Sequence, residues 1–318
     1  MPQMTPGQAR IVDPILTTHA LGYQRPGNVG LFLFPRVDVA TLGGRVITFG
    51  KEGFRRYDTK RAPGSATQRI QFGYEGSPYA IVPAALEAVV PDEIANEAAN
   101  GPGLDASSDA VDLVLDVMEL SHECDCADIA RNAANYDAGH KMTLVGASRW
   151  GGASGKPTTD IGTAKEAIRA TIGVRPNVCI LSPTAFNAAQ NNAEILDRLK
   201  YTSPDSVTPD MLAKLWQIDK VYVGEAIVAS GQADTLGDVW GNDVVLAYVA
   251  PPNGSNRRNA ARPSFGYTYS LRGQPNVRQA YRDENRQSWI HPVNNDRTPV
   301  LSGMVAGYLI KDAGASPT

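Results

Sequence analysis

The sequence predicts an α+β protein, and three features of the chain support this fold class. Residues 45–80 form two extended runs around a polar tip, residues 107–135 carry the apolar repeat of one long helix, and residues 141–249 alternate short helices and strands. The length of 318 residues corresponds to about two domains at ~150 residues each. The chain is therefore long enough to bury a substantial core.

Composition and charge exclude several classes of protein. Hydrophobic residues make up 42% and charged residues 20% of the chain, as in folded globular proteins. The net charge is −3, whereas a dedicated nucleic-acid clamp needs a basic surplus. No apolar run approaches the ~20 residues that span a bilayer, and residues 1–10 lack the apolar core of a signal peptide. We therefore expect a soluble, cytoplasmic protein with no membrane partner.

The N-terminal part of the chain predicts an arm followed by a hairpin. Residues 1–44 contain five prolines and little periodicity, which favours an extended arm that gains its order by lying against other surfaces, such as those of neighbouring copies. Residues 45–80 alternate like strands and turn at Pro63, Gly64 and Ser65, which predicts a long two-stranded hairpin. Because an isolated hairpin of this polarity is marginal in water, we expect it to lean on something outside its own fold.

Two helices are expected next. Pro91 and the two acids after it start a short helix that ends near Asn100. A longer helix begins near Ser107 and runs toward Asn135. Its apolar stripe follows the spacing i, i+3, i+4, i+7 and contains Val111, Val114, Leu115 and Met118, widened by Leu113, Val117 and Leu120. The width of this stripe predicts that much of the helix is covered.

Short helices and strands alternate from residue 141 onward. Ser182 and Thr208 are each followed by proline, which is typical of an N-cap and the first helical position. Strands are expected at residues 142–146, 178–181, 221–223 and 244–249, and a further helix at 160–172 ended by Gly173. From residue 265 the chain holds short strand-like runs broken by glycine and proline, and it ends in the apolar segment 300–310.

The motifs of enzyme chemistry are incomplete in this chain. The glycine-rich run 151–156 follows a strand and precedes a helix, but Trp150 takes the first glycine position of a phosphate-binding loop and Pro157 replaces its Ser or Thr. Residues 146–150 lack the last glycine of a nucleophile elbow. We therefore predict neither an enzymatic activity nor a cofactor.

The three cysteines do not indicate a disulfide framework or a metal site. Their odd number in a long chain argues against disulfide scaffolding. His122, Cys124 and Cys126 cluster, but only positions 122 and 126 share a helix face, and no second pair of ligands completes a zinc site. We interpret them as small side chains on a half-buried helix.

The near-zero net charge averages over blocks of opposite sign. Residues 45–69 carry seven basic and two acidic residues, and residues 253–297 carry eight arginines and three acids. Residues 70–130 carry thirteen acids and no lysine or arginine. Such blocks favour pairing between segments or between copies of the chain.

The order of these parts resembles that of a known family, the major capsid proteins of tailed bacteriophages with the Hong Kong 97-like fold. The resemblance covers nearly the whole chain and is most specific in four runs of sequence. These are VCILSPTAF at 178–186, LDRLKY at 196–201, KVYVGEA at 220–226 and WGNDVVLAY at 240–248. No chemical requirement dictates these runs, so their order and spacing carry the resemblance.

The resemblance implies a division of the chain into five parts. They are an N-terminal arm at 1–44, an E-loop hairpin at 45–80, a peripheral domain with the spine helix at 81–140, an axial domain at 141–264, and return strands to the peripheral domain at 265–318. It further implies an icosahedral shell of hexamers and pentamers around a double-stranded DNA genome, held without sequence specificity. The implied partners are other copies of the chain, a scaffolding protein, a portal and, in some members, a decoration protein. Because the recognisable arm starts almost at Met1, we expect a separate scaffolding protein and no proteolytic maturation.

The charge blocks then predict where neighbouring subunits meet. We expect the basic hairpin to lie across the acidic face of the long helix of an adjacent subunit, because many weak ion pairs of ~0–1 kcal/mol add up over a shell. The residues predicted to make this contact are Arg55, Arg56, Lys60 and Arg61 on the hairpin, and Asp109, Asp112, Asp116 and Glu119 on the helix. The alternative is that both blocks are solvated faces.

Two other functions are compatible with the sequence. An encapsulin-like compartment has the same fold and holds cargo protein instead of DNA, so the particle content distinguishes it. An enzyme of unknown type is disfavoured by the incomplete motifs.

Overall fold

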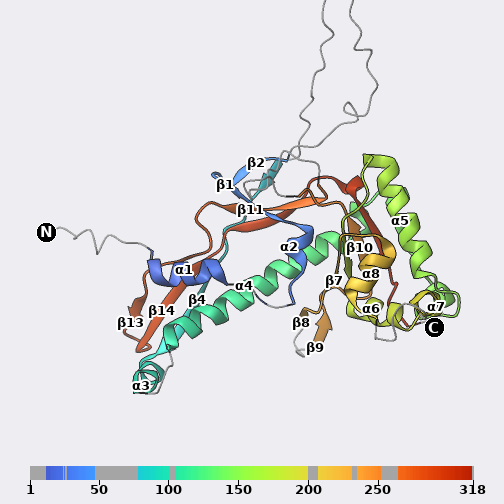
Figure 1. The fold of residues 1–318 in the computed structure, drawn as a ribbon. Coiled ribbons are helices and arrows are strands. Elements are labelled where there is room, and N and C mark those ends of the chain that lie inside the picture. Colours follow the sequence, from blue (N-terminus) through green and yellow to red (C-terminus); the bar gives the residue numbers. More distant parts are fainter. Residues whose placement is uncertain are drawn as a thin grey trace, which may run out of the picture.

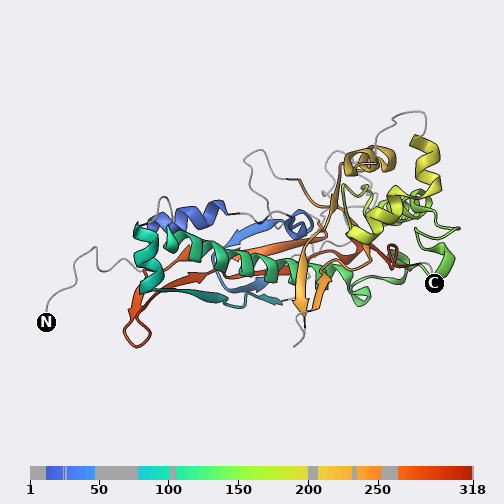
Figure 2. The same ribbon diagram turned by 90° about the horizontal axis from the view of Figure 1, so that it is seen from below.

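The computed structural model has a long helix with its sheets at one end of the molecule and a sheet covered by shorter helices at the other (Figures 1 and 2). It describes residues 12–23, 25, 27–46, 78–100, 105–199, 207–230, 235–251 and 264–316. The mixture of helices and sheets confirms the predicted α+β class.

The predicted long helix is α4, Ala106–Arg131, and it runs along the lower side of the molecule in Figure 1. The Asp105 carboxylate caps it by accepting hydrogen bonds from the first backbone N–H groups of the helix. The helix ends before the expected Asn135, because Asn132 leaves the helical conformation and caps the three-residue 3₁₀ turn that follows.

The apolar stripe of α4 is narrower than the sequence predicts. Val111, Val114 and Leu115 are buried, as expected, against the sheet beside the helix. Leu113 and Val117, in contrast, are 66% and 49% exposed, so the prediction that they widen the covered stripe is wrong for the single chain. At ~100° per residue both lie on the side of the helix opposite Leu115.

The sheet beside α4 is built around the strand pair β4 (Ala85–Pro91) and β14 (Ser288–Asn294). The two strands are antiparallel and stay in register over their full length, and β13 (Tyr281–Asp283) and β12 (Asn276–Val277) pair with the other side of β14. The short helix α3 (Asp92–Asn100) follows β4 directly, as the sequence predicts. Ala88 and Val293 point toward α4 and complete its core.

A five-stranded sheet forms the second core. Its strand order is β5 (Lys141–Thr143), β16 (Gly307–Lys311), β10 (Val244–Ala247), β6 (Val178–Leu181) and β7 (Lys220–Val223). The predicted strands at 178–181 and 244–249 are its buried centre, since β6 and β10 are buried at every position. The domain boundaries stay a prediction, but one detail differs: β16 belongs to this sheet, so residues 265–318 do not all return to the sheet beside α4.

Four helices surround the five-stranded sheet: α5 (Pro157–Ile172), α6 (Pro183–Gln190), α7 (Ala193–Leu199) and α8 (Pro209–Trp216). The predicted caps are confirmed, because the Ser182 hydroxyl accepts from the Ala185 N–H and the Thr208 hydroxyl from the Met211 N–H. Gly173 ends α5 with φ 71°, a left-handed conformation that glycine adopts without strain. Among the described residues, no helix is both long and apolar enough to cross a membrane.

The predicted extended arm is wrong over residues 14–22, which form helix α1 (Pro14–Gly22). The sequence signal was present, because Asp13 accepts hydrogen bonds from two backbone N–H groups of α1 and Pro14 takes the first helical position. The short helix α2 (Gly30–Leu33) follows. Both helices contact α4 of the same chain, so this part of the arm finds its covering surface without a second copy.

Strand β1 (Arg36–Val39) joins a three-stranded sheet, parallel to β11 (Gly266–Leu271), which pairs on its other side with β15 (Arg297–Leu301). The predicted hairpin at 45–80 is described only at its base, where β2 (Gly43–Arg45) and β3 (Pro78–Ala80) pair antiparallel. The rest of that hairpin lies outside the described residues. Strands β8 (Ile227–Ser230) and β9 (Thr235–Asp238) form a separate two-stranded hairpin. Short 3₁₀ turns occur at Ala133–Asn135, Ala138–His140, Gly146–Ser148 and Met304–Ala306.

The two sides of α4 predict opposite results for two leucine substitutions. Leu115→Ala leaves a cavity in the core under the helix and should lower the free energy of unfolding by about 2–5 kcal/mol. Leu113→Ala removes an exposed side chain from the same helix and should change it by less than about 0.5 kcal/mol. Urea denaturation of the unassembled subunit measures both, and equal losses would contradict the position of the buried stripe.

Candidate functional site on the long helix

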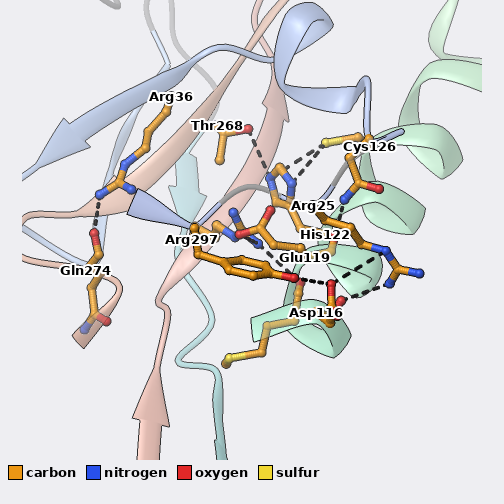
Figure 3. A network of polar contacts seen from close by, with 12 residues as sticks. Arg25, Arg36, Asp116, Glu119, His122, Cys126, Thr268, Gln274 and Arg297 are labelled. Atoms are coloured by element: carbon orange, nitrogen blue, oxygen red, sulfur yellow. Dashed lines mark hydrogen bonds and ion pairs between the residues drawn. The ribbon is translucent and has the colours of Figure 1, made fainter. Parts of the chain in front are cut away.

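The acidic face of α4 lies against the N-terminal segment of the same chain. Asp112 Oδ1 is 2.7 Å from His19 Nε2. Asp116 accepts a hydrogen bond from the Tyr23 hydroxyl, and Arg25 Nε lies 3.9 Å from Asp116 Oδ1 (Figure 3). Burial and the hydrogen bond to Asp116 raise the pKa of Tyr23 to about 12, so its hydroxyl keeps the proton that it donates.

The third acid of this face, Glu119, pairs with Arg297 of strand β15 at 2.8 Å (Figure 3). Both side chains are nearly buried, and Arg297 also donates to the Met118 carbonyl oxygen, 3.2 Å away. Buried pairs of this kind depend on complete hydrogen bonding, so this contact fixes β15 to the helix. Asp109, the fourth predicted acid, is exposed and has no ion pair within the described part of the chain.

Glu123, one turn further along α4, is the buried centre of the network and was not among the predicted site residues. Its carboxylate is 1% exposed and accepts hydrogen bonds from the N–H groups of Val29 and Gly30, at 2.9 and 2.8 Å, and from Trp240 Nε1 at 2.8 Å. Burial raises the pKa of Glu123, and the three donors oppose this rise. One carboxylate therefore joins the N-terminal segment, the long helix and the turn before β10. No local sequence signal separates it from the solvated acids around it.

His122 and Cys126 share a face of α4, as their spacing predicts, and belong to a chain of neutral hydrogen bonds (Figure 3). The Thr268 hydroxyl donates to the Phe34 carbonyl oxygen at 2.8 Å, so its oxygen accepts from His122 Nε2 at 3.2 Å. The Cys126 sulfur lies 3.7 Å from the imidazole nitrogens and donates to the remaining one, Nδ1. This arrangement suits a neutral imidazole and gives His122 a structural role.

The glycine-rich loop after β5 uses its backbone donors internally. The N–H groups of Gly152, Ser154 and Gly155 donate to carbonyl oxygens at positions 149, 147 and 152, at 2.8 to 3.1 Å. A Cβ on Gly152 would lie 2.4 Å from the Ala147 carbonyl oxygen. Glycine therefore serves the tight packing of the loop, and these N–H groups are not free to bind phosphate.

The arrangement of elements is shared with several solved structures. A phage-related protein of Bordetella bronchiseptica RB50 matches with a TM-score of 0.85 and 49% identity, covering 98% of this chain and 100% of that one. The mature capsid of bacteriophage PhiM1 matches with a TM-score of 0.52 and 12% identity, over 91% of this chain and 88% of the other. The SrpI encapsulin complex of Synechococcus elongatus PCC 7942 matches with a TM-score of 0.52 and 11% identity, over 100% and 94%. The last two likenesses show a common fold.

Sequence similarity then defines the family. The major capsid protein of Burkholderia phage BcepMu is 34% identical over 301 residues, which are 95% of this chain and 96% of that protein. The chain belongs to the phage major capsid proteins, and its role is structural, as part of a capsid. The resemblance drawn from the sequence is confirmed. No protein-family model matches the chain.

The predicted contact between the basic hairpin and the acidic helix stays a prediction. Its basic half, Arg55, Arg56, Lys60 and Arg61, lies outside the described residues. Three of the four acids already have partners in their own chain. Asp112 and Asp116 pair with an N-terminal segment that the charge pattern did not indicate, and Glu119 pairs with Arg297 of β15.

The buried imidazole predicts a loss of stability in mild acid. Burial and the nearby Arg297 charge hold the pKa of His122 well below its usual 6.5. The unfolded chain takes up a proton below about pH 6.5 and the native chain does not, so stability falls as the pH drops through that range, by up to ~1.4 kcal/mol per pH unit. His122→Gln should therefore flatten the pH dependence of the urea midpoint between pH 6.5 and 5, although it lowers stability at pH 7.

A matched control for this experiment is Cys124→Ser, a substitution on the same helix but away from the imidazole. It should keep the slope of the wild-type chain. An unchanged slope in His122→Gln would show that His122 is not the group that takes up the proton.

Proposed function

We propose that the chain assembles through hexamers and pentamers into an icosahedral shell that encloses the double-stranded DNA genome of a tailed phage. The observation that carries this proposal is the 34% identity with a phage major capsid protein over 95% of the chain. The fold shared with a mature phage capsid supports it. Scaffolding and portal proteins during assembly, and a decoration protein on the finished shell, are further predicted partners.

The surface of the single chain supports assembly with other copies. Leu113 and Val117 on α4 and Leu86 on β4 are large apolar side chains exposed to solvent. Groups of such side chains on a soluble protein mark surfaces that another molecule covers. In a shell, every subunit is surrounded by copies of the same chain, and these copies can cover its exposed apolar side chains.

Within the shell we propose that the basic hairpin of one subunit contacts exposed acids on α4 of its neighbour. The internal partners of Asp112, Asp116 and Glu119 leave Asp109 as the acid of the predicted set most available for this contact. Asp128, further along α4, is exposed as well. The hairpin cations would thus meet acids that the N-terminal segment leaves free.

Contact with DNA would involve basic residues of the 253–297 block without sequence specificity. Arg282 and Arg297 of this block are already paired, with Asp92 at 2.6 Å and with Glu119 at 2.8 Å. Arg272 and Arg278 are exposed and have no ion pair among the described residues, so they are the better candidates. Such contacts neutralise phosphates and weaken with salt.

An encapsulin-like compartment remains the alternative function, favoured by the fold shared with the SrpI encapsulin complex. That likeness is at 11% identity and concerns the fold, whereas the phage capsid protein is 34% identical over 95% of this chain. The content of the particles separates the two functions.

The first experiment is electron microscopy of the full chain produced with and without its scaffolding protein. Closed icosahedral particles are expected, and particles recovered from an infection should contain DNA that resists nuclease until the shell is opened. A chain that stays monomeric at high concentration in both preparations would contradict the shell, and particles filled with one cargo protein would favour the compartment.

The charge contact predicts the behaviour of a hairpin variant. Reversal of Arg55, Arg56, Lys60 and Arg61 to Glu should reduce particle yield and weaken the dependence of assembly on salt, because screened ion pairs are lost. A matched control reverses four basic residues in the other half of the molecule: Arg169, Arg175, Lys214 and Lys220. If both variants assemble like the wild-type chain, with the same salt response, the two charge blocks are solvated faces.

A further inference from the structure

The hairpin β8–β9 is a two-stranded sheet that stands apart from the other sheets of the molecule. Its strands pair from Ile227 opposite Asp238 to Ser230 opposite Thr235, and among the described residues no third strand pairs with either edge. Figure 1 shows the hairpin projecting from the lower side of the molecule, along which α4 also runs, and the view from below in Figure 2 places it on the same side. A hairpin of four-residue strands is marginal in water unless one or both faces are covered.

The inner face of the hairpin is covered by its own chain at Val228, whereas Thr235, further from the base on the same face, is exposed. Val228 packs against the core cluster that contains Ala226, Val239, Trp240 and Phe34. The Val239 N–H donates to the Ala226 carbonyl oxygen at 3.0 Å and extends the ladder at the hairpin base. Trp240, at the base of the hairpin, donates a hydrogen bond to the buried Glu123 carboxylate, and this contact fixes the position of the base.

The outer face of the hairpin carries three apolar side chains and one acid, and it is uncovered in the single chain. Side chains alternate across a strand, so Ile227, Ala229, Leu236 and Asp238 share this face, with Ala229 directly opposite Leu236 and Ile227 opposite Asp238. Ile227 is 46% exposed and Leu236 is 66% exposed. The surface therefore combines exposed apolar side chains with one charge at the base of the hairpin, as an interface core and its polar rim do.

We propose that the outer face of the β8–β9 hairpin is a contact between subunits, covered by a second copy of this chain. This inference rests on the proposed function, because a shell surrounds every subunit with identical ones. Asp238 is the single charged residue in the described part of the hairpin, and α4 on the same side of the molecule is acidic, so the region lacks the cations that DNA requires. A contact with a second copy needs no such cations, and it buries Ile227 and Leu236 once in every subunit.

The test places a charge on each face of the same strand. Leu236→Asp should raise the subunit concentration needed for assembly by at least about tenfold, because a buried leucine contributes more than one factor of ten to an interface. Thr235→Asp puts the same charge on the opposite face of the strand and should assemble like the wild-type chain. Leu236→Met, which keeps an apolar side chain, should do so as well. The melting temperature of the unassembled subunit should be unchanged in all three, since residues 235 and 236 are exposed.

A photoactivatable benzophenone side chain at position 236 identifies what covers the face. Irradiation of assembled particles should join two copies of the chain, and mass spectrometry then locates the partner surface. Cross-links confined to one chain, to DNA or to a different protein would overturn the inference, as would equal assembly of Leu236→Asp and the wild-type chain. If the wild-type chain itself forms no particles, the proposed function fails, and this result is distinct from the failure of the hairpin contact alone.

Discussion

The buried carboxylate of Glu123 is the contact on which the arrangement of the molecule depends. A buried carboxylate is costly unless donors surround it, and here two backbone N–H groups and one indole supply them. The donors come from the N-terminal segment and from the turn that leads into the five-stranded sheet. Three parts of the chain, more than ninety residues apart in sequence, are therefore fixed relative to one another by a single side chain.

The backbone at Gly30 is shaped by the same contact. A Cβ at this position would lie 2.8 Å from Glu123 Oε2 and 2.8 Å from the Cys126 Cβ, so only glycine lets α2 approach the helix closely enough to donate its N–H. Once α2 is in place, His19, Tyr23 and Arg25 of the preceding segment meet the acids of the next turns of α4. The negative charge of the acidic residues on α4 is thus partly compensated by residues of the same subunit.

Local sequence signals predicted much of the fold, and long-range contacts account for what they missed. The caps at Ser182 and Thr208, the end of α5 at Gly173 and the strand at 178–181 all depend on neighbouring residues and were correct. The helix α1 was missed although Asp13 and Pro14 signal it, because the many prolines around it favoured an extended arm. Glu123 and the place of β16 depend on partners sixty residues or more away, and no pattern within a window of the sequence contains that information. The class of protein could be predicted from the sequence because the order of elements resembles that of the family along nearly the whole chain.

The place of β16 also determines when the subunit can fold. This strand lies between β5 and β10, yet it follows both of them in the chain, so the sheet lacks an inner strand until residues 307–311 have been synthesised. Contacts of such long sequence separation form late and slowly. A chain whose synthesis stops before residue 307 never completes this sheet. Completion of this sheet therefore acts as a check that synthesis has passed residue 311, because shorter chains keep two unpaired strand edges inside the sheet.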